Sequence, residues 1–272
     1  MPTLLASLTL GLYLAALALY GWNLSSGSHR WAGRGATASL VLALLLHYFA
    51  LIERSREVQA VPYNDLYGSM SLFAWMLAFT YLLVESIHRQ RSVGPFVLPF
   101  VAALYLLPMI FPPGEASTAA PARGSLFALH VTSTILAYSA FALAFVLSLI
   151  YLLQSRLLRE RRLGEVFWRF PALEVLERMS RTSVMVGLAA LALGISFGSV
   201  WARRLQGNYF NADPKEIVSL GIVALYACYL WLGRTTAWRG SRAAVVCVVN
   251  FAVVLFSYTI VNLFLTGYHR FF

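Results

Sequence analysis

The chain has 272 residues, of which 60% are apolar, 14% aromatic and only 12% charged. Soluble domains are nearer half apolar and a quarter charged, so this composition excludes an ordinary soluble enzyme, and its hydrophobicity excludes a disordered chain. A net charge of +10 would suggest nucleic acid as the partner of a soluble protein. Here most arginines stand between apolar segments, where they set membrane orientation, and we expect no nucleic acid partner.

Apolar segments long enough to cross a bilayer recur along the chain. A span needs about 20 residues, and it must be helical because lipid offers no hydrogen-bond partner to open backbone. We therefore predict an all-α polytopic membrane bundle of about eight helices, with residues 1–272 forming a single membrane domain. The predicted spans are 3–22, 36–52, 66–86, 95–111, 125–154, 182–200, 216–232 and 243–265.

The distribution of arginine predicts the orientation. Loops after the odd-numbered spans carry fourteen of the 21 Lys and Arg residues. The positive-inside rule places these loops in the cytoplasm and both termini outside. Half of the fourteen lie in residues 155–181, where Phe170, Leu173 and Leu176 can share one helical face. We expect a basic amphipathic cytoplasmic loop there, which either contacts lipid headgroups or docks a cytoplasmic partner.

Histidines are the informative polar residues, because the spans contain almost no acidic side chains; Glu85 lies at a cytoplasmic helix end. The lack of buried acids argues against a proton-coupled transporter. His29 and His88 fall in basic loops, where we expect solvated rings. His47 lies inside the second span, so it is either a helix-packing histidine bonded to a carbonyl or hydroxyl, or a ligand that contacts haem. Both cysteines are expected to be buried apolar fillers.

Two further histidines, His130 and His269, are predicted at the outer face, near the start of the fifth span and just after the eighth. Two neutral imidazoles brought together there could ligate haem iron from opposite faces. The alternative is a pair of unrelated interfacial histidines. Their spacing of 139 residues does not decide between the two.

The outer loop between spans six and seven is short and aromatic. Trp201, Tyr209 and Phe210 could hold a planar macrocycle, and Arg203, Arg204 and Lys215 could pair with its propionates. The aromatic residues could equally form an interfacial belt. Asp213, Pro214 and Glu216 also have the order of a helix start, with Asp at the N-cap, Pro at N1 and Glu at N3.

At this loop the sequence resembles the cytochrome c assembly family, whose members carry a tryptophan-rich outer loop flanked by two histidines. The matching residues are Gly198, Trp201, Ala202, Gly207, Tyr209, Asp213, Pro214, Lys215 and Glu216. The segments 61–69, 129–138, 238–240 and 261–263 are similar too. The family's two tryptophans before the Asp are Phe210 and Ala212 here, and Trp231 stands where lyase members have a further histidine. These departures are typical of the branch of HemX and CcsA-like accessory proteins.

The resemblance implies a multi-pass protein of the bacterial inner (plasma) membrane that handles haem b at its outer face during cytochrome c assembly. It implies His130 and His269 as axial ligands, with Asp213 and the aromatic and basic residues of the loop around the porphyrin. The protein would not be an enzyme by itself, but a component of a haem lyase system with apocytochrome c and a second membrane subunit as partners.

Three other functions stay open from the sequence. The first is a HemX-like regulator, in which residues 156–181 bind a cytoplasmic enzyme of haem biosynthesis. The second is a redox subunit with a permanent b-type haem, which needs histidines facing each other within the spans. The third is a small-molecule transporter that uses the same bundle without haem.

Overall fold

The computed structural model of the chain describes residues 2–26, 30–59, 61–62, 66–110, 124–161, 164, 167, 170–211 and 213–260. Within these ranges the backbone is helical, with no strand. The α-helices are α1 (Pro2–Ser25), α2 (Arg30–Val58), α3 (Leu66–His88), α4 (Gly94–Ile110), α5 (Ser125–Arg159), α6 (Leu173–Gln206), α7 (Pro214–Leu232) and α8 (Ser241–Ile260). A short 3-10 helix, Thr236–Trp238, lies between α7 and α8.

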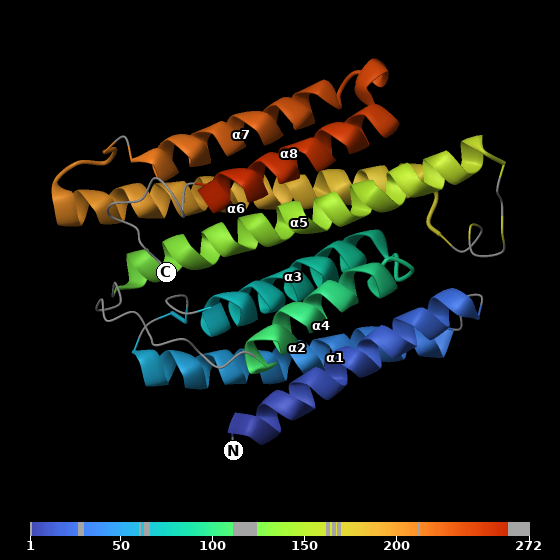
Figure 1. Ribbon diagram of the computed structural model, residues 1–272, viewed down its shortest axis with the longest axis horizontal. Coiled ribbons are helices and arrows are strands. Elements are labelled where there is room, and N and C mark those ends of the chain that lie inside the picture. The colour runs from blue at the N-terminus through green and yellow to red at the C-terminus, as the bar shows by residue number, and fades with distance from the viewer. Residues whose placement is uncertain are drawn as a thin grey trace.

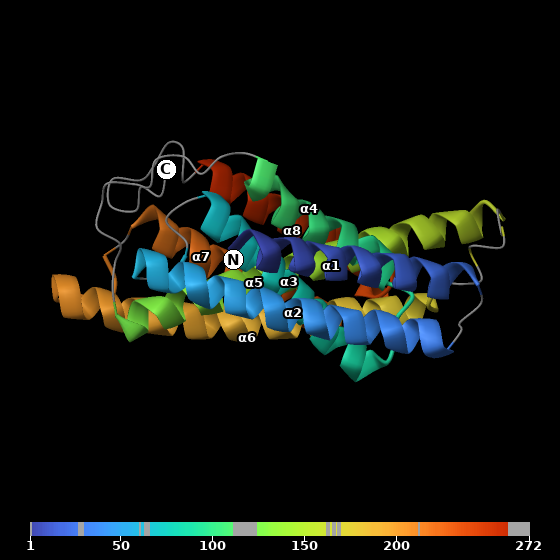
Figure 2. The ribbon, with the colours of Figure 1, turned by 90° about the horizontal axis from the view of Figure 1, so that it is seen from below.

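The helices run along one long axis in alternating directions (Figures 1 and 2). Six of those described have the length and hydropathy of membrane spans, and α4 and α8 are shorter apolar helices. The prediction of a polytopic all-α membrane bundle is confirmed. We call the end where α5 and α7 begin and α6 ends the His130 end. The end where α6 and α8 begin and α7 ends is the arginine end.

Two hydrophobic cores share the central helices α5 and α6. The first joins α1 to α4 with the later part of α5 and the start of α6; Tyr13, Leu98 and Leu147 are fully buried in it. The second joins α5 to α8, where Phe141 stacks on Tyr226 at 3.8 Å between ring centroids. Figure 1 shows α1–α4 on one side of α5 and α6 and α7–α8 on the other. Helices α5 and α6 therefore hold the two halves of the bundle together.

Helix ends extend well beyond several predicted spans. α2 covers residues 30–58 rather than 36–52, and α6 covers residues 173–206 rather than 182–200. The predicted spans covered only the apolar segments, but a helix can continue past the apolar layer because its backbone hydrogen bonds are internal and its arginines reach water. The loops around α6 are correspondingly shorter than expected.

The segment 155–181 is mostly part of the bundle. Residues 155–159 end α5, and residues 173–181 begin α6. Phe170 stacks on Phe96 with ring centroids 5.2 Å apart, Leu176 is fully buried, and Leu173 packs against the first core. The apolar face predicted to lie on the membrane interface therefore packs against other helices.

A buried polar network connects α1, α2 and α3 at the arginine end. The Glu85 carboxylate accepts hydrogen bonds from the hydroxyls of Tyr20 at 2.5 Å and Thr37 at 2.6 Å. Arg91, in the turn before α4, lies 3.5 Å from the same carboxylate and donates to the Thr37 hydroxyl at 2.9 Å. One acidic side chain thus joins four segments of the first half of the bundle.

Candidate functional site

A stripe of glycines on α6 lets α5 approach closely. A Cβ atom at Gly194 would lie 2.7 Å from the Thr134 hydroxyl, and one at Gly198 would lie 2.6 Å from Nδ1 of His130. Gly187 is likewise covered by an aromatic ring of α5. Small residues at the spacing of Gly194 and Gly198 allow this close helix packing. Its consequence is that the His130 ring lies directly against the α6 backbone.

The backbone of α6 orients the His130 imidazole. Nδ1 lies 2.8 Å from the carbonyl oxygen of Gly194. A carbonyl only accepts, so Nδ1 carries the proton and Nε2 carries the lone pair. Metal-binding histidines are commonly oriented in this way, with one ring nitrogen donating to a carbonyl and the other holding the ligand electrons.

An aromatic wall lies beside His130. Phe127, one turn earlier on α5, has its ring centroid 6.2 Å from that of His130 and 4.8 Å from that of Trp201 on α6. Phe127 is buried and Trp201 is half-buried. Phe127, which the sequence reasoning missed, therefore lies between His130 and Trp201 and contacts both rings. The signal was its position three residues before His130, on the same helix face.

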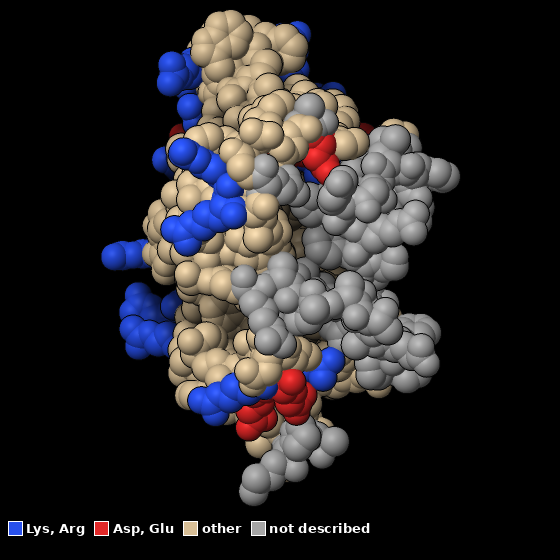
Figure 3. Space-filling view, turned by 90° about the vertical axis from the view of Figure 1, so that its left-hand side faces the viewer, with Lys and Arg blue, Asp and Glu red and all other residues tan. Residues whose placement is uncertain are grey.

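The other predicted site residues lie at the same end of the bundle but form a separate pair. Arg203 donates a hydrogen bond to the Tyr209 hydroxyl, and its guanidinium lies over the Tyr209 ring, 4.4 Å from the centroid. Phe210 and Arg204 are exposed. Among the described rings, Trp201 contacts Phe127 and neither Tyr209 nor Phe210. Figure 3 faces this end and shows Lys and Arg side chains spread over it.

The turn between α6 and α7 has the predicted helix start. Gly207 ends α6 in the left-handed conformation, with φ 82°. Asp213 is the N-cap of α7, and its Oδ1 accepts the backbone N–H of Lys215 at 2.8 Å. Glu216 accepts the N–H of Asn211 at 2.9 Å. Capping thus fixes the start of α7, whatever further role these residues have.

Replacing Asp213 by alanine is expected to lower the free energy of unfolding by about 1 kcal/mol, because the N–H of Lys215 loses its acceptor. Asp213→Asn, which keeps a side-chain oxygen, should retain most of the stability. Thermal unfolding of both variants in detergent, followed by circular dichroism, measures the difference. Equal stability of Asp213→Ala and the wild type would contradict the cap.

The second proposed ligand, His269, lies outside the described residues, and so does His29. The convergence of His130 and His269 therefore stays a prediction. Ala212, the residue that replaces a family tryptophan, is also outside the described ranges. The site described by the structure consists of His130, its α6 contacts and the adjoining aromatic wall.

His47 has the environment of a helix-packing histidine. It is fully buried, with Nδ1 3.0 Å from the Tyr13 hydroxyl and Nε2 2.9 Å from the Ser71 hydroxyl. The Tyr105 ring contacts its edge at 4.5 Å between centroids. Both ring nitrogens are thus engaged by hydroxyls of neighbouring helices, the first of the two alternatives given by the sequence. Coordination of a metal would require one of these hydrogen bonds to break.

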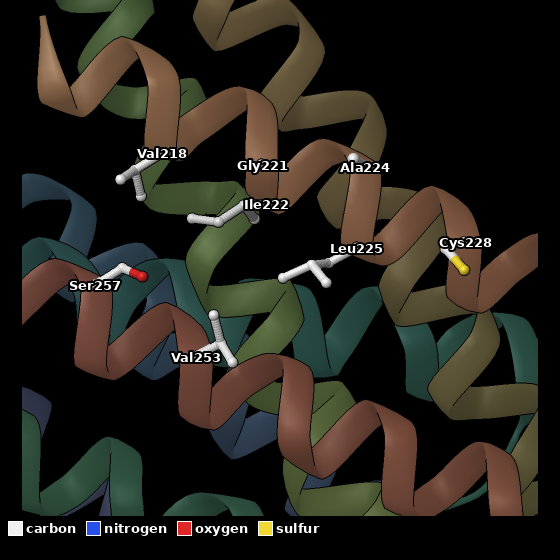
Figure 4. Close-up of a pocket in the computed structure, with 8 residues that line it drawn as sticks. All are labelled: Val218, Gly221, Ile222, Ala224, Leu225, Cys228, Val253 and Ser257. Carbon is white, nitrogen blue, oxygen red and sulfur yellow. The ribbon is translucent and has the colours of Figure 1, made fainter.

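Two smaller expectations are corrected. His88 is not in a solvated loop: it ends α3 and contacts the Thr182 hydroxyl on α6 at 3.0 Å. Cys247 is buried as expected, but Cys228 is exposed. Cys228 lines an open groove of about 450 Å³ between α7 and α8, with Leu225 and Val253 (Figure 4). The groove is mostly apolar and has no histidine in its lining.

The described residues fit one half of a haem site. His130 offers an oriented imidazole with its lone pair on Nε2, and Phe127 and Trp201 give an apolar flank. Arg204 and Lys215 supply positive charge at the same end of the bundle. An imidazole, aromatic faces and basic groups match the iron, the ring and the propionates of a haem.

Comparison with known proteins identifies the family. Residues 63–269 match the family described as Cytochrome C assembly protein. The matched region covers most of the chain and contains the His130 end. This multi-pass membrane protein belongs to the cytochrome c assembly family.

Individual relatives agree over nearly the full length. The chain is 30% identical to the cytochrome c biogenesis protein CcsA of Synechococcus sp. (strain CC9605), over 96% of this chain and 93% of that protein. It is 31% identical to CcsA of Parasynechococcus marenigrum (strain WH8102), over 96% and 92%. A solved structure of the cytochrome c heme lyase CcmF has the same fold, with a TM-score of 0.64 at 16% identity. The chain covers 47% of CcmF, so it spans about half of that protein.

Proposed function

We propose that this protein acts in cytochrome c assembly by holding haem b at the His130 end of the bundle, with His130 and His269 as axial ligands. The observation that carries the proposal is the hydrogen bond from His130 Nδ1 to the Gly194 carbonyl, which sets Nε2 as the ligand nitrogen. Family membership and the similarity to CcsA support it. We place the protein in the bacterial inner membrane, with this end on the outer face.

Each residue of the site has a distinct part in the proposal. Gly194 and Gly198 keep the imidazole in place, and Phe127 and Trp201 exclude water from one side of it. Arg204 and Lys215 attract the propionates. Arg203 holds Tyr209 beside the short outer loop, so that Tyr209 and Phe210 extend the aromatic surface.

The haem supplies the porphyrin that an apocytochrome c acquires through thioether bonds. This chain has no CxxCH motif of its own, so the acceptor cysteines belong to a partner. The part of this chain is to bind the haem, orient it and shield it from water. Thioether formation then requires apocytochrome c and a second membrane subunit of the assembly system, and the chain is not an enzyme by itself.

The absorption spectrum of the protein purified from haem-supplied cells tests the proposal. We expect a Soret band in the wild type and its loss or shift in both His130→Ala and His269→Ala. His88→Ala is the matched control, since that histidine lies at the arginine end. A Soret band unchanged in the His130 and His269 variants would remove the ligand assignment.

Two other functions stay predictions with direct tests. Regulation of a haem-biosynthetic enzyme through residues 156–181 would be seen as capture of that enzyme by the wild type and its loss on charge reversal of the exposed Arg156 and Arg159. A permanent b-type haem would be reduced by added quinol. In the described spans His47 is bonded to Tyr13 and Ser71, which favours the outer site over an intramembrane one.

A further inference from the structure

At the arginine end, two guanidinium groups converge on one backbone oxygen. Arg181 of α6 donates from Nη1 to the Gly233 carbonyl at 3.0 Å, and Arg239 donates from Nε to the same oxygen at 3.2 Å. Gly233 is the C-cap of α7. Because both nitrogens contact one oxygen, the separation of Arg181 Nη1 and Arg239 Nε cannot exceed the 3.0 Å and 3.2 Å distances added together. Two positive charges so close repel each other unless an anion or solvent screens them.

Among the described residues, neither Arg181 nor Arg239 forms an ion pair with a carboxylate. Glu177, one turn before Arg181, uses its Oε2 to accept the Gly240 N–H at 3.2 Å. The ion pairs between described residues are Arg54–Glu57, Arg91–Glu85, Arg156–Glu160 and Arg178–Glu174. Each guanidinium has five N–H donors, and the Gly233 carbonyl takes one from each. The pair, which carries two positive charges beside the one negative charge of Glu177, therefore keeps most of its donors for an anion.

The surroundings of the pair are basic and carry exposed tryptophans. Arg234 and Arg242 are exposed in the same turn, between the end of α7 and the start of α8, and so is Trp238. At the same end of the bundle, the exposed rings of Trp22 and Trp31 contact each other at 5.0 Å. Exposed tryptophans at the ends of spanning helices mark the headgroup region of a bilayer.

We propose that Arg181 and Arg239, with Arg234 and Arg242 beside them, bind the phosphodiester of an anionic phospholipid at the α7–α8 turn (upper right in Figure 1). A guanidinium fork matches two oxygens of a phosphate group, and clustered arginines next to a spanning helix are typical of anionic-lipid sites. Free phosphate has the same chemistry, but lipid presents it at the height of this turn. The lipid would add a further link between the end of α7, α6 and the start of α8.

Lipid retention by the full-length protein tests the proposal. The protein in non-ionic detergent is mixed with dioleoylphosphatidylglycerol or dioleoylphosphatidylcholine, and native mass spectrometry counts the bound molecules. We expect selective binding of the glycerol lipid, weakened about fivefold by Arg181→Gln or Arg239→Gln and further by the double variant. Arg156→Gln, at the same end but paired with Glu160, should change binding less than about twofold.

A second variant separates the site from a loss of folding. Arg239→Lys keeps the charge and removes the fork, so it should fold as the wild type does and bind phosphatidylglycerol more weakly. Circular dichroism checks the fold of each variant. Equal weakening by Arg156→Gln, unchanged binding in the double variant, or full displacement of the lipid by equimolar inorganic phosphate would each overturn the proposal.

Discussion

Replacing Glu85 by alanine is expected to lower the free energy of unfolding by about 3 kcal/mol. The side chain is 4% exposed and is the common acceptor for the hydroxyls of Tyr20 and Thr37. Alanine would leave both hydroxyls and the Arg91 guanidinium without that acceptor. This loss of stability is at the lower end of the range for removing one partner of a buried ion pair. The reason is that the Arg91 side chain is 39% exposed and can turn toward water.

The matched control for Glu85 is Glu174→Ala. The Glu174 side chain is 78% exposed and lies 3.9 Å from Arg178, so its removal should cost less than about 0.5 kcal/mol. Glu85→Gln keeps an acceptor but loses the charge. Its free energy of unfolding should lie between those of Glu85→Ala and Glu174→Ala. Unfolding by sodium dodecyl sulfate, followed by circular dichroism, ranks the variants. Equal loss from Glu85→Ala and Glu174→Ala would mean that the buried network gives no net stabilisation.

Gly198→Ala is expected to reduce haem affinity at least about tenfold and to destabilise the protein by about 1–3 kcal/mol. The added Cβ would lie 2.6 Å from His130 Nδ1 and 2.9 Å from its Cε1, so the ring must move or the two central helices must separate. Either change breaks the hydrogen bond to the Gly194 carbonyl and misplaces Nε2. Haem titration by Soret absorbance and thermal unfolding without haem give the two quantities separately.

Gly11→Ala is the control for this substitution, since nothing lies within 4 Å of a Cβ built there. In a helix interior, alanine is favoured over glycine by up to about 1 kcal/mol, so the control should be neutral or slightly more stable. If Gly198→Ala were less stable but bound haem with unchanged affinity, the close helix packing would be supported and the role of His130 would be refuted. If Gly198→Ala and Gly11→Ala were equally stable, the close packing of α5 against α6 at Gly198 would be refuted.

Hydropathy was sufficient to predict the class of fold, and local chemistry predicted the start of α7. Asp213 caps the helix as its position before Pro214 implies, because capping depends only on neighbouring residues. The positions of the helix ends were harder to predict. Arg30 and Arg178 lie inside α2 and α6, although hydropathy placed both outside the spans, because helical hydrogen bonding does not stop where the lipid does.

The contacts around His130 could not be predicted from the sequence. The GxxxG pair of α6 was visible in the sequence, yet nothing local showed that His130, 64 residues earlier than Gly194, would be its partner. Arg203 and Tyr209 were expected to face a haem separately, and the structure pairs them with each other. Such contacts depend on the rotation of each helix about its axis, which the packing of the whole bundle decides.

The length of the central helices has a consequence for the membranes in which the protein can work. α5 and α6 have 35 and 34 residues, so each extends about 50 Å, whereas the hydrocarbon layer is about 30 Å thick. Thicker or thinner bilayers would immerse more or less of these helices and change their tilt. The register between Gly194 and His130 would stay the same, because it is set by two rigid helices in contact. The imidazole should therefore keep its orientation across lipids of different chain length.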